Sequence, residues 1–286
     1  MTAVSSLEGA VEEAVETEII LDRERLVRHL KRLHAATGEV VLSGPFMAAV
    51  ENHDLCVMTG GLHDVEPLPH PIGIGSLDKL VGALGCLQSD QVEVSVKNGE
   101  LVCAAPDRRV RIRTHEPDLR AGGGGQMDPA TKQNIVNMFA DADWQPFRPE
   151  VAKGVVQAIS GLGEAHAEVA FRVGREGMTI IVYLLSIDFH RAEFDVAEVT
   201  AEDSFTLLLK GDQVRSIFSQ IGPSLPVIAL LGSKQVIGVR FQDEDNSVEV
   251  MYAISALEQG PKGRRSRTLP HPAPPSPEPQ ETNVAP

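Results

Sequence analysis

A short basic stretch near the N-terminus stands out in a chain whose net charge is strongly negative. It contains Arg23, Arg25, Arg28, Lys31 and Arg32 beside the acidic residues Asp22 and Glu24. Arg25, Arg28 and Arg32 follow an i, i+3, i+7 spacing, which puts them along one side of a helix, opposite a leucine stripe. Basic side chains attract phosphate oxygens, and this spacing shows no paired arrangement for reading individual bases. The stretch therefore predicts sequence-independent attraction to phosphates.

Three further basic residues occupy comparable positions on later helical stretches, on the side away from the apolar residues. They are Lys79, Lys153 and Arg215. An amphipathic helix has a polar face whatever its function, so a solvated surface is the alternative for each of these helices. The first stretch is harder to explain that way, because its positive charge runs against the net charge of -14 for the whole chain.

Two His-Asp pairs, His53-Asp54 and His63-Asp64, fall in expected loops and have side chains that can bind a metal ion or relay protons. Turn formation is the simpler explanation of both pairs, because Asp stabilises turns. The sequence contains no GxSxG, HExxH or CxxC motif and no GxxxxGK[ST] phosphate-binding loop. We therefore expect no catalytic residue, no metal site and no cofactor.

The composition excludes several classes of protein. The cysteines Cys56, Cys86 and Cys103 form no CxxC pair, which argues against a disulfide framework or a cysteine-rich zinc site and fits a reducing compartment. An acidic start, where a leader would be basic and then apolar, argues against export. The longest apolar run, at 178–187, is about half as long as a membrane-spanning helix requires. We expect a cytoplasmic protein without a membrane segment.

One pattern of elements recurs four times along the chain: an amphipathic helix followed by short alternating strands. The helices begin near Asp22, Ser76, Arg148 and Asp212. The second unit is the clearest, because QVEVSVK at 91–97 leads through Asn98-Gly99, a strong hairpin signal, to a returning strand. The recurrence predicts an α+β fold of four strand-helix-three-strand units, with the helices on one face of antiparallel sheets.

These units group into two domains, flanked by segments that are too polar to pack. We expect a flexible acidic arm at 1–16, an N-terminal domain at 17–120, an interdomain connector at 121–147, a C-terminal domain at 148–257 and a disordered, proline-rich tail at 258–286. The connector contains four consecutive glycines and then Asp128-Pro129, which predicts the start of a short helix reaching about Phe139.

The fourfold alternation over two domains resembles the DNA sliding clamps, in particular the phage processivity factors and the proliferating-cell-nuclear-antigen type. The segment SFTLLLKGDQVRSIFSQIGP is similar to the part of a clamp in which an apolar strand runs into an amphipathic helix. The segment QVIGVRFQDEDNSVEVMYAISAL resembles the hairpin with an acidic turn and the final strand that end a clamp. The segment IGSLDKLVGALGCLQSDQVEVSVKNGELV resembles the second unit of phage clamps. The resemblance covers about residues 17–257 and concerns pattern rather than a unique signature.

The resemblance implies a non-enzymatic protein that closes head to tail into a ring around duplex DNA and tethers the replicative DNA polymerase, giving processivity. The ring would be a homotrimer of two-domain subunits, with sheets outside and helices lining the hole, placed on DNA by a clamp loader ATPase. The basic helix residues would then face DNA, and an acidic exterior is expected, because a topological tether needs only weak attraction. A phage-encoded clamp would act in the cytoplasm of its host.

Clamps of this kind take short partner peptides in an apolar pocket beside the connector and the last strands. The matching positions are Val236, Ile237, Met251, Tyr252, Ala253 and Ile254. Ordinary core packing is the alternative for these residues. Residues 133–139 read QNIVNMF, which weakly mimics the glutamine-plus-apolar spacing of clamp-binding peptides, although a short packed helix explains this stretch better.

Two other interpretations stay open at this level. One is a clamp-fold processivity factor that holds DNA as a monomer or dimer without closing a ring. The other is an enzyme of α+β fold that uses His53, Asp54, His63 and Asp64.

Overall fold

The computed structural model describes residues 18–52, 54–115, 126–162, 167–184, 191–197, 204–242 and 248–257. The expected acidic arm, the four-glycine run and the proline-rich tail fall outside these ranges, and so does His53. No helix in the described ranges combines the length and the apolar character of a bilayer-spanning segment.

The first half of the chain folds as two successive units of strand, helix and three strands. Its elements are β1 (Ile19–Asp22), α1 (Arg23–His34), β2 (Val40–Leu42), β3 (Ala48–Asn52), β4 (Leu55–Thr59), β5 (Ile72–Ile74), α2 (Leu77–Gly85), β6 (Gln91–Lys97), β7 (Glu100–Ala104) and β8 (Arg109–His115). The helix α1 begins at the cap expected from the sequence, because the Asp22 carboxylate accepts the Arg25 amide at 2.7 Å. The β6–β7 turn has positive φ at both Asn98 and Gly99, as a tight hairpin requires.

The connector contributes one helix, and two further units follow it. The elements are α3 (Pro129–Met138), β9 (Gln145–Pro146), α4 (Pro149–Leu162), β10 (Ala167–Gly174), β11 (Gly177–Leu184), β12 (Arg191–Ala197), β13 (Phe205–Lys210), α5 (Gly211–Phe218), β14 (Val227–Leu231), a 3₁₀ turn (Gly232–Lys234), β15 (Val236–Gln242) and β16 (Glu249–Ser255). The strand β9 opens the third unit, and the sequence pattern does not reveal it, because two residues show no alternation. The helix α5 starts at Gly211, one residue before the expected Asp212.

The two units of each half exchange their opening strands. In the first half, β1 pairs with β6 of the second unit, and β5 pairs with β2 of the first unit, in both cases antiparallel. The second half repeats this arrangement, since β9 pairs with β14 and β13 pairs with β10. Neither unit of a half completes its sheet alone. The four recurring units of the sequence thus correspond to two pseudo-symmetric halves of two units each.

One sheet runs across the boundary between the halves. The strand β4 of the first half pairs antiparallel with β16 of the second half, and this pairing is called the seam below. The strands β3, β4, β16, β15, β14 and β9 lie in that order in a six-stranded sheet, called the shared sheet below. The buried apolar residues on either side of the seam form one core.

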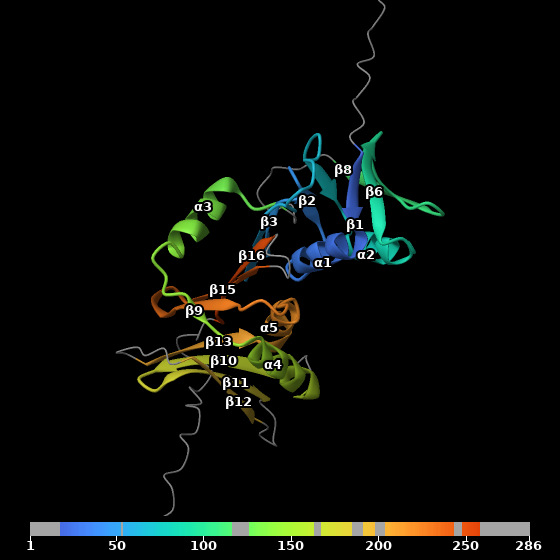
Figure 1. Ribbon diagram of the computed structural model, residues 1–286. Coiled ribbons are helices and arrows are strands. Elements are labelled where there is room, and N and C mark those ends of the chain that lie inside the picture. The colour runs from blue at the N-terminus through green and yellow to red at the C-terminus, as the bar shows by residue number, and fades with distance from the viewer. Residues whose placement is uncertain are drawn as a thin grey trace, which may run out of the picture.

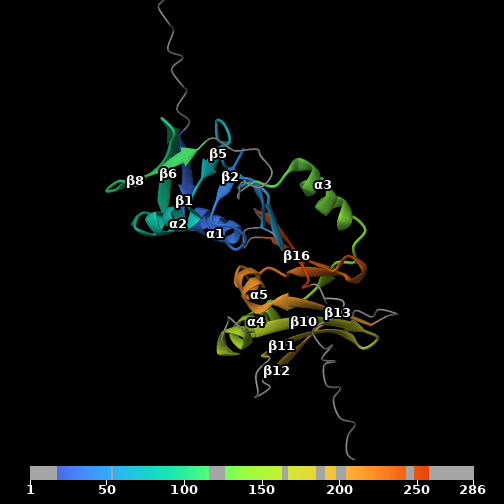
Figure 2. The same ribbon diagram turned by 180° about the vertical axis from the view of Figure 1, so that it is seen from behind.

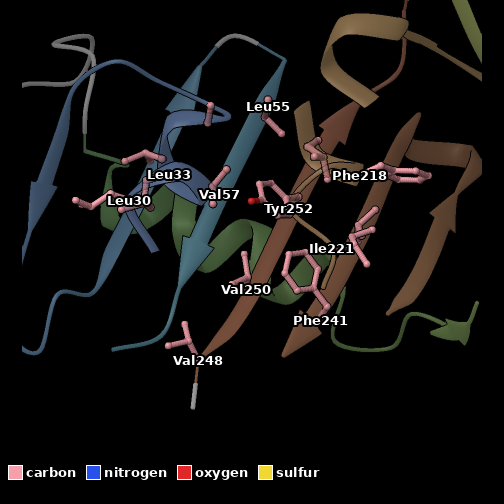
Figure 3. Packing of buried hydrophobic residues seen from close by; sticks show 14 of the residues in the cluster. Leu30, Leu33, Leu55, Val57, Phe218, Ile221, Phe241, Val248, Val250 and Tyr252 are labelled. Carbon is pink, nitrogen blue, oxygen red and sulfur yellow. The ribbon is translucent and has the colours of Figure 1, made fainter. Parts of the chain in front are cut away.

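Tyr252 lies at the centre of the seam. It is fully buried, and its hydroxyl donates to the Arg32 carbonyl of α1 at 3.2 Å. Figure 3 shows it beside Val57 on β4 and Phe241 on β15, and the centres of the Phe241 and Tyr252 rings are 5.9 Å apart. One aromatic side chain thus contacts both halves.

The four helices of the repeated units lie on one side of the sheets, and α3 lies on the opposite side (Figure 1 and Figure 2). The helix α1 packs beside α2, and α4 packs beside α5. Each buries the apolar stripe that its sequence spacing predicts. Between the first two helices, Nε2 of His34 lies 2.8 Å from Oδ1 of Asp78. The expected α+β architecture of helices on one face of antiparallel sheets is confirmed.

The cysteines differ in exposure and should differ in reactivity. Cys86 is exposed, Cys56 is half-buried and Cys103 is buried. Burial raises the pKa of Cys103 to about 12, and burial followed by the Glu51 carboxylate raises the pKa of Cys56 to about 11. The thiolate is the nucleophile, so iodoacetamide at about pH 8 should modify Cys86 rapidly and the other two thiols slowly, as read by peptide mass spectrometry. Rapid modification of Cys103 in the folded protein would contradict its buried position.

Candidate nucleic-acid interface

The eight basic residues predicted to face phosphates lie on α1, α2, α4 and α5, but their exposure differs. The exposed ones are Lys31, Lys79 and Lys153. The half-buried ones are Arg23, Arg25, Arg28 and Arg215. Arg32 is buried. All except Arg32 are therefore accessible on the helix side of the molecule.

Two of the arginines make local contacts at the start of α1. Nη2 of Arg25 donates to the His63 carbonyl at 3.0 Å, which ties α1 to the loop after β4. Nη2 of Arg23 lies 3.9 Å from Oε1 of Glu24, a long ion pair that contributes little to stability. The Arg25 hydrogen bond restricts its guanidinium group, so a phosphate that binds there has less side-chain entropy to remove.

The prediction that Arg32 faces phosphates is wrong. Arg32 is 4% exposed, and its guanidinium carbon lies 5.8 Å from the centre of the Phe241 ring on β15. Residues of the second half of the chain pack over the last turn of α1. Residue spacing within one helix cannot show that a segment distant in the sequence buries part of it. Arg32 therefore belongs to the packing of the seam.

Acidic residues are interleaved with the basic ones on the same helices. They are Glu24, Asp78, Glu150 and Asp212, all exposed. Each lies in the first turn of its helix, where the helix dipole favours a carboxylate. Their negative charge would oppose a phosphate approaching the neighbouring basic groups, so the helix side suits weak attraction to an anion rather than tight binding.

A groove of about 680 Å³ lies between the end of α1 and the helices α4 and α5. Lys210 and Arg215 both line it, and Nζ of Lys210 lies 3.2 Å from Oδ2 of Asp54 across the boundary between the halves. The sequence prediction includes Arg215 but misses Lys210, because Lys210 ends a strand and does not lie on a helix face. Only the tertiary arrangement brings these two cations into one groove.

The described members of the two His-Asp pairs have turn and ion-pair roles. Asp54 pairs with Lys210, His63 accepts a hydrogen bond through its main-chain carbonyl, and Asp64 is a turn residue with a φ of 61°. The fourth member, His53, lies outside the described residues. Within the ranges that the structure describes, no group of three or more His, Cys, Asp or Glu side chains is suited to hold a metal ion.

The six residues expected to line a partner pocket alternate between two faces of the shared sheet. Val236, Met251 and Ala253 lie on the outer face, away from the main core. Ile237, Tyr252 and Ile254 are fully buried in the main core. The pocket prediction is wrong for these three core residues, because successive residues of a strand point to opposite faces.

The helix α3 covers the outer face of the shared sheet. Ile135 and Phe139 are buried there against Ala229 and Ala253, in an apolar cluster separate from the main core. The Phe139 ring lies so close to Gly238 that a β-carbon at this position would be 2.5 Å from the ring. The covered surface is called the outer seat below and consists of Cys56, Ala229, Gly238, Met251 and Ala253.

The strands β8 and β12 lie at opposite ends of the molecule (Figure 1 and Figure 2). Among the described residues, positions 109–113 of β8 pair only with β7, and β12 pairs only with β11. We call residues 109–113 of β8 and the strand β12 the free edges, meaning only that no second strand pairs with them among the described residues; Thr114 and His115 of β8 pair with β5. Their exposed residues are Arg109, Arg111 and Arg113 on β8 and Glu193 and Asp195 on β12. The intervening residues Val110, Ile112, Phe194 and Val196 pack against the main core. Among the side chains that the structure describes, the edge at 109–113 is therefore basic, with Nη1 of Arg111 3.6 Å from Oε2 of Glu100 on β7, and the edge at β12 is acidic.

Solved structures with this architecture are sliding clamps. The A. fulgidus PCNA bound to the C-terminal region of FEN-1 has a TM-score of 0.63 at 13% identity, and the match covers 85% of this chain and 99% of that chain. The Thermococcus kodakaraensis PCNA has a TM-score of 0.58 at 11% identity, with coverage of 84% and 99%. The Helicobacter pylori beta clamp bound to a DNA ligase peptide has a TM-score of 0.54 at 10% identity, with coverage of 89% and 70%. No protein-family model and no curated protein matches the sequence. The chain therefore has the fold of the DNA sliding clamps.

Proposed function

We propose that this protein is a DNA sliding clamp, whose subunits close head to tail into a ring around duplex DNA and tether a DNA polymerase to it. The observation that carries the proposal is a clamp fold that ends in two free edges of opposite charge. A ring of three subunits is the stoichiometry that the clamp resemblance implies. A clamp loader ATPase would open this ring to admit DNA.

The two free edges match on both faces. If β8 of one subunit pairs with β12 of the next, the exposed arginines of β8 come beside Glu193 and Asp195 on the outer face. On the helix face, Ile112 and Phe194 come from the two strands and extend the apolar layer between subunits. Pairing would also extend the main-chain ladder on the side of each strand where the described residues show no strand partner.

The helix side supports weak contact with DNA. Its lysines and arginines attract the phosphate backbone, while the first-turn carboxylates limit the number of strong contacts. Few strong contacts mean little release of counterions and hence little drag along the duplex. The ring would hold DNA by enclosure, and the helix charges would draw the subunits to DNA while the ring closes, so they would set how many rings are loaded on the circle.

A topological assay tests the proposal. Subunits separated by dilution are concentrated again with nicked circular plasmid, and bound protein is separated from free protein by gel filtration. We expect protein to travel with the circle at physiological salt and to leave when one restriction cut makes the DNA linear. Equal retention on linear DNA would favour a processivity factor that does not close a ring. A stable monomer at micromolar concentration in analytical ultracentrifugation would contradict the ring directly.

Reversing exposed charges on the helix side should weaken DNA retention without opening the ring. Lys31→Glu, Lys79→Glu and Lys153→Glu together replace attraction by repulsion on three helices. We expect the fraction of protein retained on circular DNA to fall about tenfold, with unchanged sedimentation in the absence of DNA.

A matched control reverses three exposed charges that lie on none of the four helices. It combines Lys132→Glu, Arg175→Glu and Lys234→Glu and makes the same change in net charge. Retention of this control should equal that of the wild type. Equal loss in both variants would mean that net charge alone, and not the helix side, determines retention.

Partner peptides would bind at the outer seat. The A. fulgidus PCNA was solved with the C-terminal region of FEN-1, and the H. pylori beta clamp with a DNA ligase peptide. The outer seat is apolar, lies under the connector and is on the side of the sheet away from the helices that would line the ring. A polymerase or another DNA-processing protein bound there would follow the ring along DNA without contacting its inner surface.

A further inference from the structure

The outer seat is already occupied by the connector of the same chain. Met127, Ile135 and Phe139 are 3%, 7% and 4% exposed and pack over the seat. The Met127 amide donates to the Ala49 carbonyl of β3 at 2.8 Å, which fixes one end of this segment beside the shared sheet. An incoming peptide would therefore meet a filled site.

The seat is shaped for two aromatic rings. A β-carbon at Gly238 would lie 2.5 Å from the Phe139 ring and 2.8 Å from the Trp144 ring, so glycine lets both rings lie close to β15. The two rings are 5.4 Å apart, and the guanidinium carbon of Arg240 lies 4.7 Å from the centre of the Trp144 ring. These contacts make a binding site for large planar side chains with a cation beside it.

The segment that fills the seat can leave without opening the main core. The helix α3 has ten residues, fewer than an isolated helix needs for stability in water. Ile135 is its one buried position, and Val136 beside it is 44% exposed. The apolar cluster under α3 is separate from the main core, so its opening is a local event.

We propose that residues 127–144 act as an internal ligand that blocks the outer seat until a partner peptide displaces it. The partner carries a short apolar peptide with an aliphatic and an aromatic side chain at the i, i+4 spacing of Ile135 and Phe139. This proposal rests on the proposed function, since it concerns regulation of the partner site of a clamp. The apparent affinity of each partner is reduced according to the fraction of molecules whose seat is open.

A binding experiment with the full chain tests the internal ligand. The probe is a fluorescein-labelled synthetic peptide with the sequence of residues 126–147. The freed variant carries Ile135→Ser and Phe139→Ser, which removes two of the apolar side chains that hold the connector on the seat. The matched control carries Asn134→Ser and Val136→Ser, two exposed positions of the same helix. By fluorescence anisotropy, the freed variant should bind the peptide about tenfold more tightly than the wild type and the control.

Several outcomes would overturn the proposal. Equal affinity of the wild type and the freed variant would show that the connector does not compete, and no binding to either would show that the seat takes no peptide. Adding Gly238→Ala to the freed variant puts a β-carbon where the ring must lie, so binding should be lost. Undiminished binding to that variant would place the peptide elsewhere.

Hydrogen exchange of the wild type gives a second test that needs no substitution. Amides of α3 should exchange faster than those of β15 and β16, because α3 opens alone. Equally slow exchange in α3 and β16 would contradict local opening.

The circular-DNA assay on the freed variant separates the two proposals. If the freed variant is retained on circular DNA but does not bind the peptide, the internal-ligand proposal alone is overturned. Peptide binding of the expected strength without retention would support the internal ligand and count against the sliding clamp.

Discussion

Reversing the charge of the basic free edge is expected to separate the ring into single subunits. The double substitution Arg111→Glu and Arg113→Glu places acidic side chains on β8 opposite Glu193 and Asp195 of the next subunit. Like charges held side by side across an interface cost several kcal/mol, so the dissociation constant should rise by about 100-fold or more. Sedimentation velocity at micromolar concentration checks the change, and loss of retention on circular DNA should accompany it.

A charge exchange gives the matched rescue. The variant Glu193→Arg with Asp195→Arg should also dissociate, whereas a chain that carries all four substitutions should assemble again, because its edges regain opposite charges. The control Lys132→Glu with Lys234→Glu reverses two charges outside both free edges and should leave the ring intact. Unaltered sedimentation of the two single-edge variants would mean that the subunits meet through other surfaces.

Mixing the two single-edge variants shows whether the number of subunits in the ring is even or odd. An acidic β8 then meets a basic β12, and a basic β8 meets an acidic β12, whenever the two variants alternate around the ring. Alternation closes only in a ring with an even number of subunits, and in a trimer one joint always brings like charges together. The mixture should therefore fail to form closed trimers, although the chain with all four substitutions succeeds.

The second large effect is expected at Tyr252, the residue that packs between the two halves. Replacing a fully buried aromatic side chain by alanine removes its apolar contacts and leaves a cavity, which costs about 3–5 kcal/mol. Tyr252→Ala should lower the free energy of unfolding by that amount in urea titrations followed by circular dichroism. Leu225→Ala, at a site that is 61% exposed, should change it by less than about 0.5 kcal/mol. Wild-type stability of Tyr252→Ala would contradict the packing of the seam.

Tyr252→Phe isolates the hydroxyl group. Loss of the hydrogen bond to the Arg32 carbonyl should cost about 1 kcal/mol near neutral pH. Burial raises the pKa of Tyr252 above its ordinary value, although the Arg32 charge partly opposes this shift. The folded state thus favours the neutral phenol over the phenolate. The contribution of this preference to the free energy of unfolding is complete at lower pH and is lost as the pH rises beyond the pKa of an exposed tyrosine. Above about pH 10, stability should therefore fall more steeply in the wild type than in Tyr252→Phe.

Elements with local signals follow from the sequence. Asn98-Gly99 predicts the β6–β7 hairpin, because the turn needs positive φ at both positions and these residues tolerate it. Asp22 predicts the start of α1, because Asp is a favoured N-cap residue. In the structure its carboxylate does cap this helix. The period of about 3.6 residues also separates Lys31 from the apolar stripe correctly. These features depend on residues within a few positions of one another.

Features that depend on distant segments could not be predicted in the same way. Arg32 has the spacing of a solvent-facing residue and becomes buried only because Phe241 and Tyr252 close over α1. Strand alternation predicts that Val236 and Ile237 face opposite sides, but the partner that covers each side is set by the fold. The alternation of RVRIR at 109–113 predicts that three arginines share one face of a strand, but the exchange of opening strands and the position of the two free edges emerge only from strand pairing.

The pairing of β4 with β16 has a consequence for how the protein is made. Thr59 pairs with Val250, a separation of 191 positions, so the edge of β4 stays open during synthesis until β16 has left the ribosome. An open strand edge is a template for pairing with other chains. A product shortened before Glu249 would keep this edge open permanently. The last strand thus distinguishes finished from unfinished molecules, because an incomplete chain exposes a surface that chaperones and proteases can bind.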